Sequence, residues 1–391
     1  MTTTINNEHK KLNVPNLRFP EFQGEWEKHE LGDICETITD FVAAGSFASL
    51  RENVKYYQED NYAQLVRTVD LKKDFTNNDF VYVDELAYDF LWRVQLKEPN
   101  IILPNIGANI GEKYYVSPED LPKEKNVLGP NAILLRSKCN DTHFVYFRLS
   151  TSSYDNEMKK LVGASGQPKF NKTDLKKVRL FMPSLKEQKK ISHFLGLLEE
   201  RIATQNKIID KLQSLIKGIA QKIVRNKTNV RLAECLECKS STLQESEVCE
   251  QGTYPVYGAN GIVGYLDNYS TEGEAIYIIK DGSGVGTVSY VTGKCSATGT
   301  LNTLQAKEGY SLQYFYYLLK VFNFEPYKTG MAILHIYFKD YGKAKVFCPS
   351  YTEQLQYARL LSAIDNKLSI EQNLLTELSL QKQYLLRQMF I

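Results

Sequence analysis

The chain has 391 residues, a length that predicts two to three domains at roughly 150 residues each. It carries 48 Lys and Arg against 46 Asp and Glu, and the net charge of +2 removes the simple argument for nucleic-acid binding, which would start from a strongly basic domain, and excludes an acidic disordered chain. With 43% hydrophobic and 24% charged residues, the composition is typical of a globular protein with an ample core. The 25 Tyr and 18 Phe supply many rings suited to packing and to contact surfaces.

Residues 1–19 are polar and lack the apolar run of a signal peptide, so they are interpreted as a lead-in segment. The sequence also lacks an uninterrupted stretch of 18 apolar residues, which excludes a membrane-spanning helix. The 7 Cys are odd in number and scattered, a pattern that favours free thiols in a reducing compartment. We therefore expect a cytoplasmic protein.

Two globular segments are expected, over residues 20–183 and 229–349, and both predict a mixed α/β fold. Each contains a strand, a glycine-rich turn and a second strand, at 100–116 and 275–291. Because β-branched and aromatic residues follow these glycines, a hairpin is favoured over a dinucleotide-binding loop, which would open a helix. Shorter strands are predicted at 64–69, 80–83, 132–137 and 300–306, and helical stretches at 143–161 and 311–322.

An internal repeat joins the two halves of the chain. When the sequence is shifted by 166 residues, 174–198 aligns with 340–364 without a gap and eight of 25 positions are identical. The shared element contains a strand, a Pro-Ser pair and the start of a helix. Ser184 and Ser350 are predicted to cap these helices, with Glu187 and Glu353 completing a capping box.

Long helices follow within 184–228 and 350–391, and each carries apolar residues at alternating spacings of three and four. A 3.5-residue repeat sustained in this way predicts a coiled coil, although two helices buried separately in two domains remain an alternative. At 1.5 Å per residue, each helix is about 57 Å long, a rigid spacer. The seam residues are Leu195, Leu198, Ile202, Gln205, Ile209 and Leu212 in the first helix, and Leu361, Ile364, Leu368, Glu371, Leu375 and Leu378 in the second.

Three polar residues, Gln205, Glu371 and Lys382, interrupt the apolar seam, and the first two of them are equivalent under the same shift. Equivalent units pack most simply about a pseudo-two-fold axis, which makes the two helices antiparallel. This arrangement predicts that Gln205 and Glu371 lie near the midpoint of the seam, where a polar pair fixes register at some cost in stability.

Recognisable catalytic motifs are absent from the sequence, including a phosphate loop, the H-E-x-x-H metal motif and the G-x-S-x-G motif. The Asn/Asp-Pro-Pro-aromatic motif of amino-methyltransferases is also missing. Cys235 and Cys238 have the spacing of metal ligands, but Cys249 and Cys295 do not, so we predict no metal site. Because the catalytic motifs are missing, we also predict no catalytic residue in this chain.

One segment has a strong local charge excess. Residues 159–190 contain ten Lys or Arg against Asp174 and Glu187, a local balance of +8. A solvated face is one explanation, and a set of phosphate contacts that position DNA without reading its sequence is the other. The equivalent segment 325–356 sums only to +1, so an equal phosphate grip by both halves is not expected.

Taken together, these segments resemble the specificity subunit of a type I restriction–modification enzyme. The resemblance extends over nearly the whole chain and rests on residues 16–34, on 163–191 and its repeat 329–354, and on the glycine-rich segments 104–116 and 254–291. It implies two target recognition domains, each reading one half of a split DNA sequence. It also implies an antiparallel helix pair that sets the gap between the half-sites and docks the partner subunits.

The resemblance implies a chain without chemistry of its own. Two modification subunits would bring S-adenosylmethionine and methylate adenine, and two restriction subunits would use ATP and Mg²⁺ to translocate and cleave double-stranded DNA. No cofactor is then expected in this chain, and no membrane contact.

Base-reading residues are predicted from polar and aromatic side chains in the expected loops, which can pair with base edges in the major groove. Turn or core roles explain such residues equally well. For the first domain the candidates are Asn105, Asn109, Lys113, Tyr114, Ser165, Gln167, Lys169 and Lys172, and for the second they are Tyr257, Asn260, Lys280, Ser283, Tyr290, His335 and Lys339.

Two other functions stay open at this point. A coiled-coil adaptor would bind proteins at its globular ends and show no DNA specificity. A methyltransferase in its own right would bind S-adenosylmethionine as an isolated chain, which the missing motif argues against.

Overall fold

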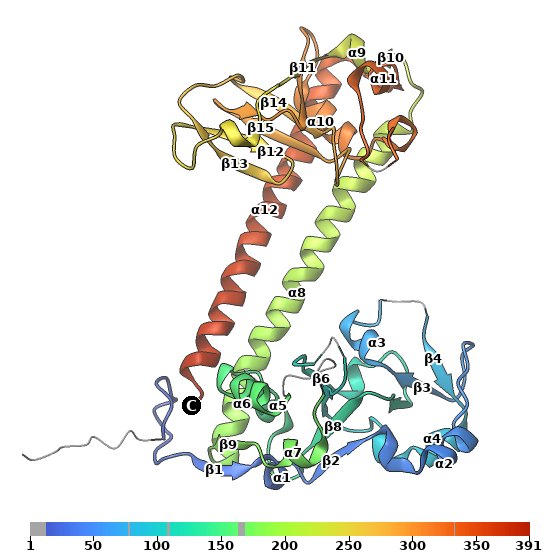
Figure 1. Cartoon of the computed structure of the whole chain (residues 1–391), viewed down its shortest axis with the longest axis vertical. Coiled ribbons are helices and arrows are strands. Elements are labelled where there is room, and N and C mark those ends of the chain that lie inside the picture. The colour runs from blue at the N-terminus through green and yellow to red at the C-terminus, as the bar shows by residue number, and fades with distance from the viewer. Residues whose placement is uncertain (1–12, 77–78, 108–109, 163–168, 332) are drawn as a thin grey trace, which may run out of the picture. The chain divides into compact units, whose positions relative to one another are not determined.

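The computed structural model describes residues 13–76, 79–107, 110–162, 169–331 and 333–391. The chain divides into two compact units, one formed by residues 1–203 with 376–391 and the other by residues 204–375. The long helices α8 (Leu185–Val224) and α12 (Tyr351–Gln388) contribute residues to both units. Each unit is described below by itself (Figure 1).

The described residues of the first unit form three small sheets. A four-stranded antiparallel sheet has the order β2-β8-β5-β6, and a three-stranded sheet has the order β4-β3-β7, in which β3 and β7 are parallel. Strands β1 and β9 form an antiparallel pair. The strands are β1 (Glu27–Glu30), β2 (Thr37–Asp40), β3 (Ala63–Val66), β4 (Val81–Val83), β5 (Asn100–Pro104), β6 (Tyr114–Val116), β7 (Asn126–Leu128), β8 (Ala132–Arg136) and β9 (Arg179–Met182).

Short helices connect and cover these strands. They are α1 (Leu31–Ile34), α2 (Phe47–Asn53), α3 (Thr68–Lys72), α4 (Glu85–Phe90), α5 (Thr142–Leu149), α6 (Ser152–Val162) and α7 (Lys172–Lys176). One core lies around α5 and includes Trp26, Phe144, Leu195 and Leu385, so both long helices pack into it. A second core is formed mainly by the three-stranded sheet and α4.

The second unit repeats this topology. Its four-stranded sheet has the order β11-β17-β14-β15, its three-stranded sheet the order β13-β12-β16 with β12 and β16 parallel, and β10 pairs with β18. The strands are β10 (Val230–Arg231), β11 (Leu236–Ser240), β12 (Tyr254–Gly258), β13 (Gly261–Leu266), β14 (Glu274–Ile279), β15 (Val288–Thr292), β16 (Ser296–Ala297), β17 (Leu301–Ala306) and β18 (Lys345–Val346). The helices are α9 (Leu232–Cys235), α10 (Leu312–Lys320) and α11 (Phe338–Tyr341).

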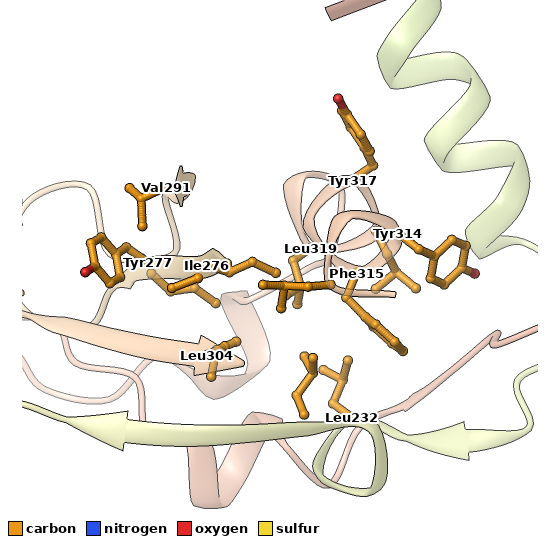
Figure 2. Close-up of a cluster of buried hydrophobic side chains, with 14 of the residues drawn as sticks. Leu232, Ile276, Tyr277, Val291, Leu304, Tyr314, Phe315, Tyr317 and Leu319 are labelled. Carbon is orange, nitrogen blue, oxygen red and sulfur yellow. The ribbon is translucent and has the colours of Figure 1, made fainter. Parts of the chain in front are cut away.

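Helix α10 covers the four-stranded sheet of the second unit. Figure 2 shows Phe315 and Leu319 of this helix facing Ile276 and Leu304 of the sheet. Tyr317 points away from the sheet, and its hydroxyl donates to Asp365 of α12 at 3.3 Å. The apolar side chains therefore fix the helix on the sheet, and a polar contact ties it to the long helix.

The prediction of a mixed α/β fold with an internal repeat is confirmed, and so are both hairpins, because β5 pairs with β6 and β14 with β15 in antiparallel register. Two local predictions were wrong. The predicted strand 64–69 ends at Val66, because the buried Asp70 carboxylate accepts from the Arg67 backbone N–H at 2.9 Å and starts α3. The predicted helix 143–161 is interrupted between α5 and α6, where the Ser150 and Thr151 hydroxyls donate to the carbonyl oxygens of Tyr146 and Arg148.

Candidate nucleic-acid interface

One predicted loop residue of each half, Asn105 in the first and Lys280 in the second, lies in the same structural setting. In the first unit Asn105 follows β5, and its carbonyl oxygen accepts from the Phe170 backbone N–H at 3.3 Å. In the second unit Lys280 follows β14, and its carbonyl oxygen accepts from the Ile336 backbone N–H at 2.9 Å. Each hairpin therefore lies against a segment about 60 residues further along the chain. The sequence predicted residues in both segments but not that backbone hydrogen bonds would join them.

The second unit gathers several candidates at this contact. The His335 ring nitrogen Nδ1 lies 2.7 Å from an Asp281 carboxylate oxygen, and both side chains are about one-third exposed. His335 stacks on Tyr337 with ring centroids 6.4 Å apart, and Lys339 places its ammonium 5.2 Å from the same Tyr337 ring. This is a surface with a donor, an acceptor, a cation and an aromatic face, the groups that read base edges and stack on bases.

The other candidates of the second unit divide into two kinds. Asn260, in the turn between β12 and β13, and Ser283, in the loop after β14, are exposed. Tyr257 and Tyr290 are half-buried, and they pack against Tyr277 and Tyr316 with ring centroids 5.6 and 5.3 Å apart. Burial raises the pKa of Tyr290 above its ordinary value. The two tyrosines are therefore held by the core, whereas Asn260 and Ser283 are accessible.

Several candidates of the first unit already have acidic partners. Lys113 forms an ion pair with Asp155 at 2.6 Å, and Lys172 forms one with Asp40 at 2.7 Å. The Tyr114 hydroxyl donates to Glu112, and burial together with this carboxylate raises the pKa of Tyr114. Lys169 is exposed. Three further candidates, Asn109, Ser165 and Gln167, lie outside the described residues.

The basic segment 159–190 is less free than its sequence indicates. Five of its cations form ion pairs, namely Lys160 with Glu157, Lys172 with Asp40, Lys177 with Asp174, Arg179 with Glu30 and Lys190 with Glu21. Lys176, Lys186 and Lys189 are exposed, and none of them has an ion-pair partner within the described ranges of the chain. These three lysines are available for phosphate contacts.

Sequence reasoning missed a polar groove of about 580 Å³ in the first unit. Its walls include Trp92, Arg93, Lys138 and Lys176. The Trp92 ring is 63% exposed and stacks under the Arg93 guanidinium at 4.8 Å, a pair suited to contact with sugar and phosphate. The sequence did carry one signal for this groove, because one of the 2 Trp in the chain is followed directly by an Arg.

One carboxylate of this groove is held in its ionised form. Burial disfavours the charge on Glu36, but the backbone N–H groups of Lys138 and Cys139 donate to its oxygens at 2.8 and 3.2 Å. The hydrogen bonds dominate, and they lower the pKa of Glu36 to about 2. The carboxylate fixes the loop that carries Lys138 into the groove.

The residues predicted for the seam of the two long helices are buried or partly buried in the unit to which each belongs. Leu195, Gln205, Ile209, Leu361, Leu368, Glu371 and Leu378 are buried, and Leu198, Ile202, Leu212, Ile364 and Leu375 are partly buried. In the second unit, the Gln205 side-chain amide donates to the Glu371 carboxylate and, at 3.0 Å, to its carbonyl oxygen. Gln205 begins the α8 segment of that unit and Glu371 lies near the end of its α12 segment, so the segments run antiparallel.

In the first unit, Lys382 of α12 forms an ion pair with Glu199 of α8 at 2.5 Å. Glu199 also lies 3.4 Å from the His143 ring. Burial disfavours the charged form of Glu199, but His143 and Lys382 together lower its pKa. Lys382, which interrupts the apolar seam in the sequence, is thus neutralised by a residue of the facing helix.

Among the described residues no group of His, Cys, Asp and Glu could hold a metal ion. Within the same residues, no helix is both long enough and apolar enough to cross a membrane.

Comparison with protein families shows to which family the chain belongs. The sequence profile of the type I restriction modification DNA specificity domain matches the chain twice, over residues 23–214 and 225–380. The chain belongs to this family. The specificity subunit assigned to the type I restriction enzyme MjaX of Methanocaldococcus jannaschii is 27% identical over 222 residues, which are 55% of this chain and 49% of that protein. The match thus spans about half the length of that relative.

Solved structures of the specificity-subunit family share the fold. The type I restriction–modification S subunit from M. genitalium superimposes with a TM-score of 0.67 at 17% identity, and the match covers 97% of this chain and 99% of that one. A chain from a structure that describes complex assembly and conformational transition of a type I system superimposes with a TM-score of 0.50 at 14% identity, covering 92% and 96%.

Proposed function

We propose that this chain is the DNA-recognition subunit of a type I restriction–modification complex. Each globular domain reads one half of a bipartite target, and the paired helices set the gap between the halves. The observation that carries the proposal is that the same loop arrangement occurs twice. A backbone hydrogen bond joins Phe170 to Asn105 in the first unit, and another joins Ile336 to Lys280 in the second. Two copies of one recognition surface in one chain suit two half-sites.

The adaptor alternative accounts for the helices but not for the composition of the loops. The partly exposed His335 with the exposed Tyr337 and Lys339, together with the Trp92–Arg93 pair of the groove, combines cations with aromatic faces. Such surfaces suit nucleic acid better than an apolar protein partner, which would need a buried hydrophobic centre.

The catalytic steps are proposed to belong to partner subunits. Two modification subunits would bind S-adenosylmethionine and methylate adenine, and two restriction subunits would use ATP and Mg²⁺. The long helices offer docking faces for the modification subunits, because exposed apolar residues lie at equivalent positions of both. Phe194 and Leu360 are 40% and 50% exposed, and Leu185 and Tyr351 are 42% and 49% exposed.

Binding of the reconstituted complex to duplex DNA tests the recognition role. We expect sequence-dependent affinity that falls steeply between 50 and 200 mM salt, because phosphate contacts release counterions. Equal affinity for all duplexes, or an affinity that does not respond to salt, would favour the adaptor. Labelled S-adenosylmethionine should bind the complex and not the isolated chain.

The ruler role has its own test. Insertion of one heptad into both α8 and α12, close to Gln205 and Glu371, keeps the seam in register and lengthens each helix by about 10 Å. We expect a longer gap in the methylated target with both half-sites unchanged. An unchanged gap would refute the ruler role and leave the recognition role intact.

A further inference from the structure

One turn of the second unit carries an exposed apolar tip. Met331 is fully exposed, and Ile333 and Leu334 are 58% and 40% exposed, although all three lie in the same short turn. Single exposed apolar residues are ordinary on a protein surface, whereas several gathered in one place indicate contact with another molecule. The tip is therefore a candidate contact site.

Backbone contacts hold this turn in place. Thr329 and His335 exchange two backbone hydrogen bonds, of 2.9 and 2.7 Å, which close the turn. The Leu334 carbonyl oxygen accepts from the Gly282 backbone N–H at 3.0 Å, so the turn is joined to the loop between β14 and β15. Gly330 has a φ of +100°, and a Cβ at this position would clash with a carbonyl oxygen of the same turn. The turn is thus fixed in a shape that leaves its apolar side chains outside.

The internal repeat does not require an apolar tip. Under the 166-residue shift, the first half of the sequence has two polar residues and a proline where the second half has Met331, Ile333 and Leu334. The aligned residues of the first half are Ser165, Gln167 and Pro168. The apolar side chains belong to one half of the repeat, which indicates a role in what that half binds.

The groups beside the tip are those of a DNA-reading surface. His335, which closes the turn, lies 2.7 Å from the Asp281 carboxylate, and Lys339 places its ammonium 5.2 Å from the Tyr337 ring. Neither Lys339 nor Lys280 forms an ion pair within the part of the chain that the structure describes. Cations around apolar side chains suit an anionic partner that also presents apolar groups. Duplex DNA meets both conditions, because the thymine C5-methyl group lies in the major groove.

We propose that this tip contacts thymine C5-methyl groups in the half-site read by the second domain, with Met331 and Ile333 as specificity-determining residues. The proposal rests on the DNA-recognition role and names one feature that this domain reads. An apolar side chain distinguishes thymine from cytosine by the methyl group that cytosine lacks. Only the major groove presents this methyl group, and there the neighbouring His335 and Asp281 can also pair with base edges.

Replacement of thymine by deoxyuridine tests the contact, because it removes only the C5-methyl group. Binding of the reconstituted complex is measured on its target duplex, with the thymines of one half-site replaced at a time. We expect the replacement in the half-site of the second domain to weaken binding about fourfold for each methyl group that loses its contact. The double variant Met331→Ala with Ile333→Ala should bind the thymine and deoxyuridine forms of that half-site with nearly equal affinity.

Two controls accompany this experiment. The replaced side chains are exposed, so the double variant should keep the unfolding midpoint of the wild type. Leu86→Ala removes a side chain that is 80% exposed in the first unit, and it should keep the full difference between the thymine and deoxyuridine duplexes. If Leu86→Ala also loses the difference, the effect is not local to the tip and the thymine contact is refuted.

The outcomes separate this contact from the recognition role. Equal binding to all duplexes would refute the recognition role itself. If binding depends on sequence but deoxyuridine changes it in neither half-site, or if the double variant keeps the wild-type difference, the thymine contact is refuted and the recognition role stands. A double variant that keeps the thymine preference but loses its modification subunits in size-exclusion chromatography would show that the tip binds a protein, which also refutes the proposal.

Discussion

The first glutamate of each long helix has a different role in the two halves, although the sequence makes them equivalent. Glu187 is 1% exposed, and it accepts two hydrogen bonds from the Arg18 guanidinium, each at 2.8 Å, and one from the Trp26 indole at 3.4 Å. Glu353 is exposed and accepts from the backbone N–H and hydroxyl of Ser350. Glu187→Gln therefore breaks a buried ion pair, whereas Glu353→Gln only weakens a helix cap.

The expected magnitudes differ several-fold. Breaking a buried pair costs about 3 kcal/mol, at the low end of its range because Arg18 is partly exposed, and loss of a capping contact costs about 0.5–1 kcal/mol. With an unfolding slope of about 3 kcal/mol per M of urea, Glu187→Gln lowers the midpoint of unfolding by about 1 M.

Tryptophan fluorescence during urea unfolding measures this difference, because both tryptophans report on the first unit. The Glu353→Gln variant serves as the control and should leave the tryptophan transition where it is. Equal shifts for the two variants, or a shift of less than about 0.3 M for Glu187→Gln, would show that the buried pair with Arg18 does not stabilise the unit.

Three further results are expected. Replacing both Gln205 and Glu371 by Leu should raise the free energy of unfolding by about 1–2 kcal/mol, because apolar contact replaces a buried polar pair, and it should make the register of the two helices less specific. Urea unfolding followed by circular dichroism measures the change in free energy, and the single variant Gln205→Leu, which we expect to be destabilised, serves as the comparison. The pKa of Glu36 in the folded state, about 2, is below the ordinary value, so the stabilisation that the ionised carboxylate gives is complete above about pH 4.5 and is lost as pH falls toward 2. Glu36→Gln should therefore make the free energy of unfolding depend less on pH between about 4.5 and 2 and nowhere else. An unchanged pH dependence would contradict the assignment. Ala replacements of Trp92 and Arg93 should weaken target binding about tenfold and reduce its salt dependence without changing the methylated sequence, whereas a changed sequence would show that the groove reads bases.

The parts of the fold that repeat were predictable from the sequence, because periodic patterns carry them. Leu361 and Leu368 are seven residues apart, a spacing that places both on one face of a helix. Gln205 and Glu371, which the 166-residue shift aligns in the sequence, are also joined by a hydrogen bond in the structure. Hairpins at 100–116 and 275–291 were predictable because residues suited to strands surround the glycines.

The sequence was less informative where a side chain meets a partner far along the chain. Arg67 lies in a stretch whose residues favour a strand, but its backbone N–H and its side chain both donate to the buried Asp70 carboxylate, and these hydrogen bonds start a helix. The local excess of +8 over 159–190 does not show that Asp40, Glu30 and Glu21 neutralise three of its cations. Likewise, the groove that contains Trp92 does not follow from a local sequence pattern, because it depends on which elements pack together.

Methylome sequencing of cells that produce this chain together with its modification subunit tests the central claim most directly. The recognition role predicts methylated adenine in a single two-part motif, with two defined half-sites separated by a gap of fixed length and unspecified sequence. Methylation of one contiguous motif would contradict the assignment of one half-site to each domain. Methylation that does not depend on this chain would contradict the recognition role itself.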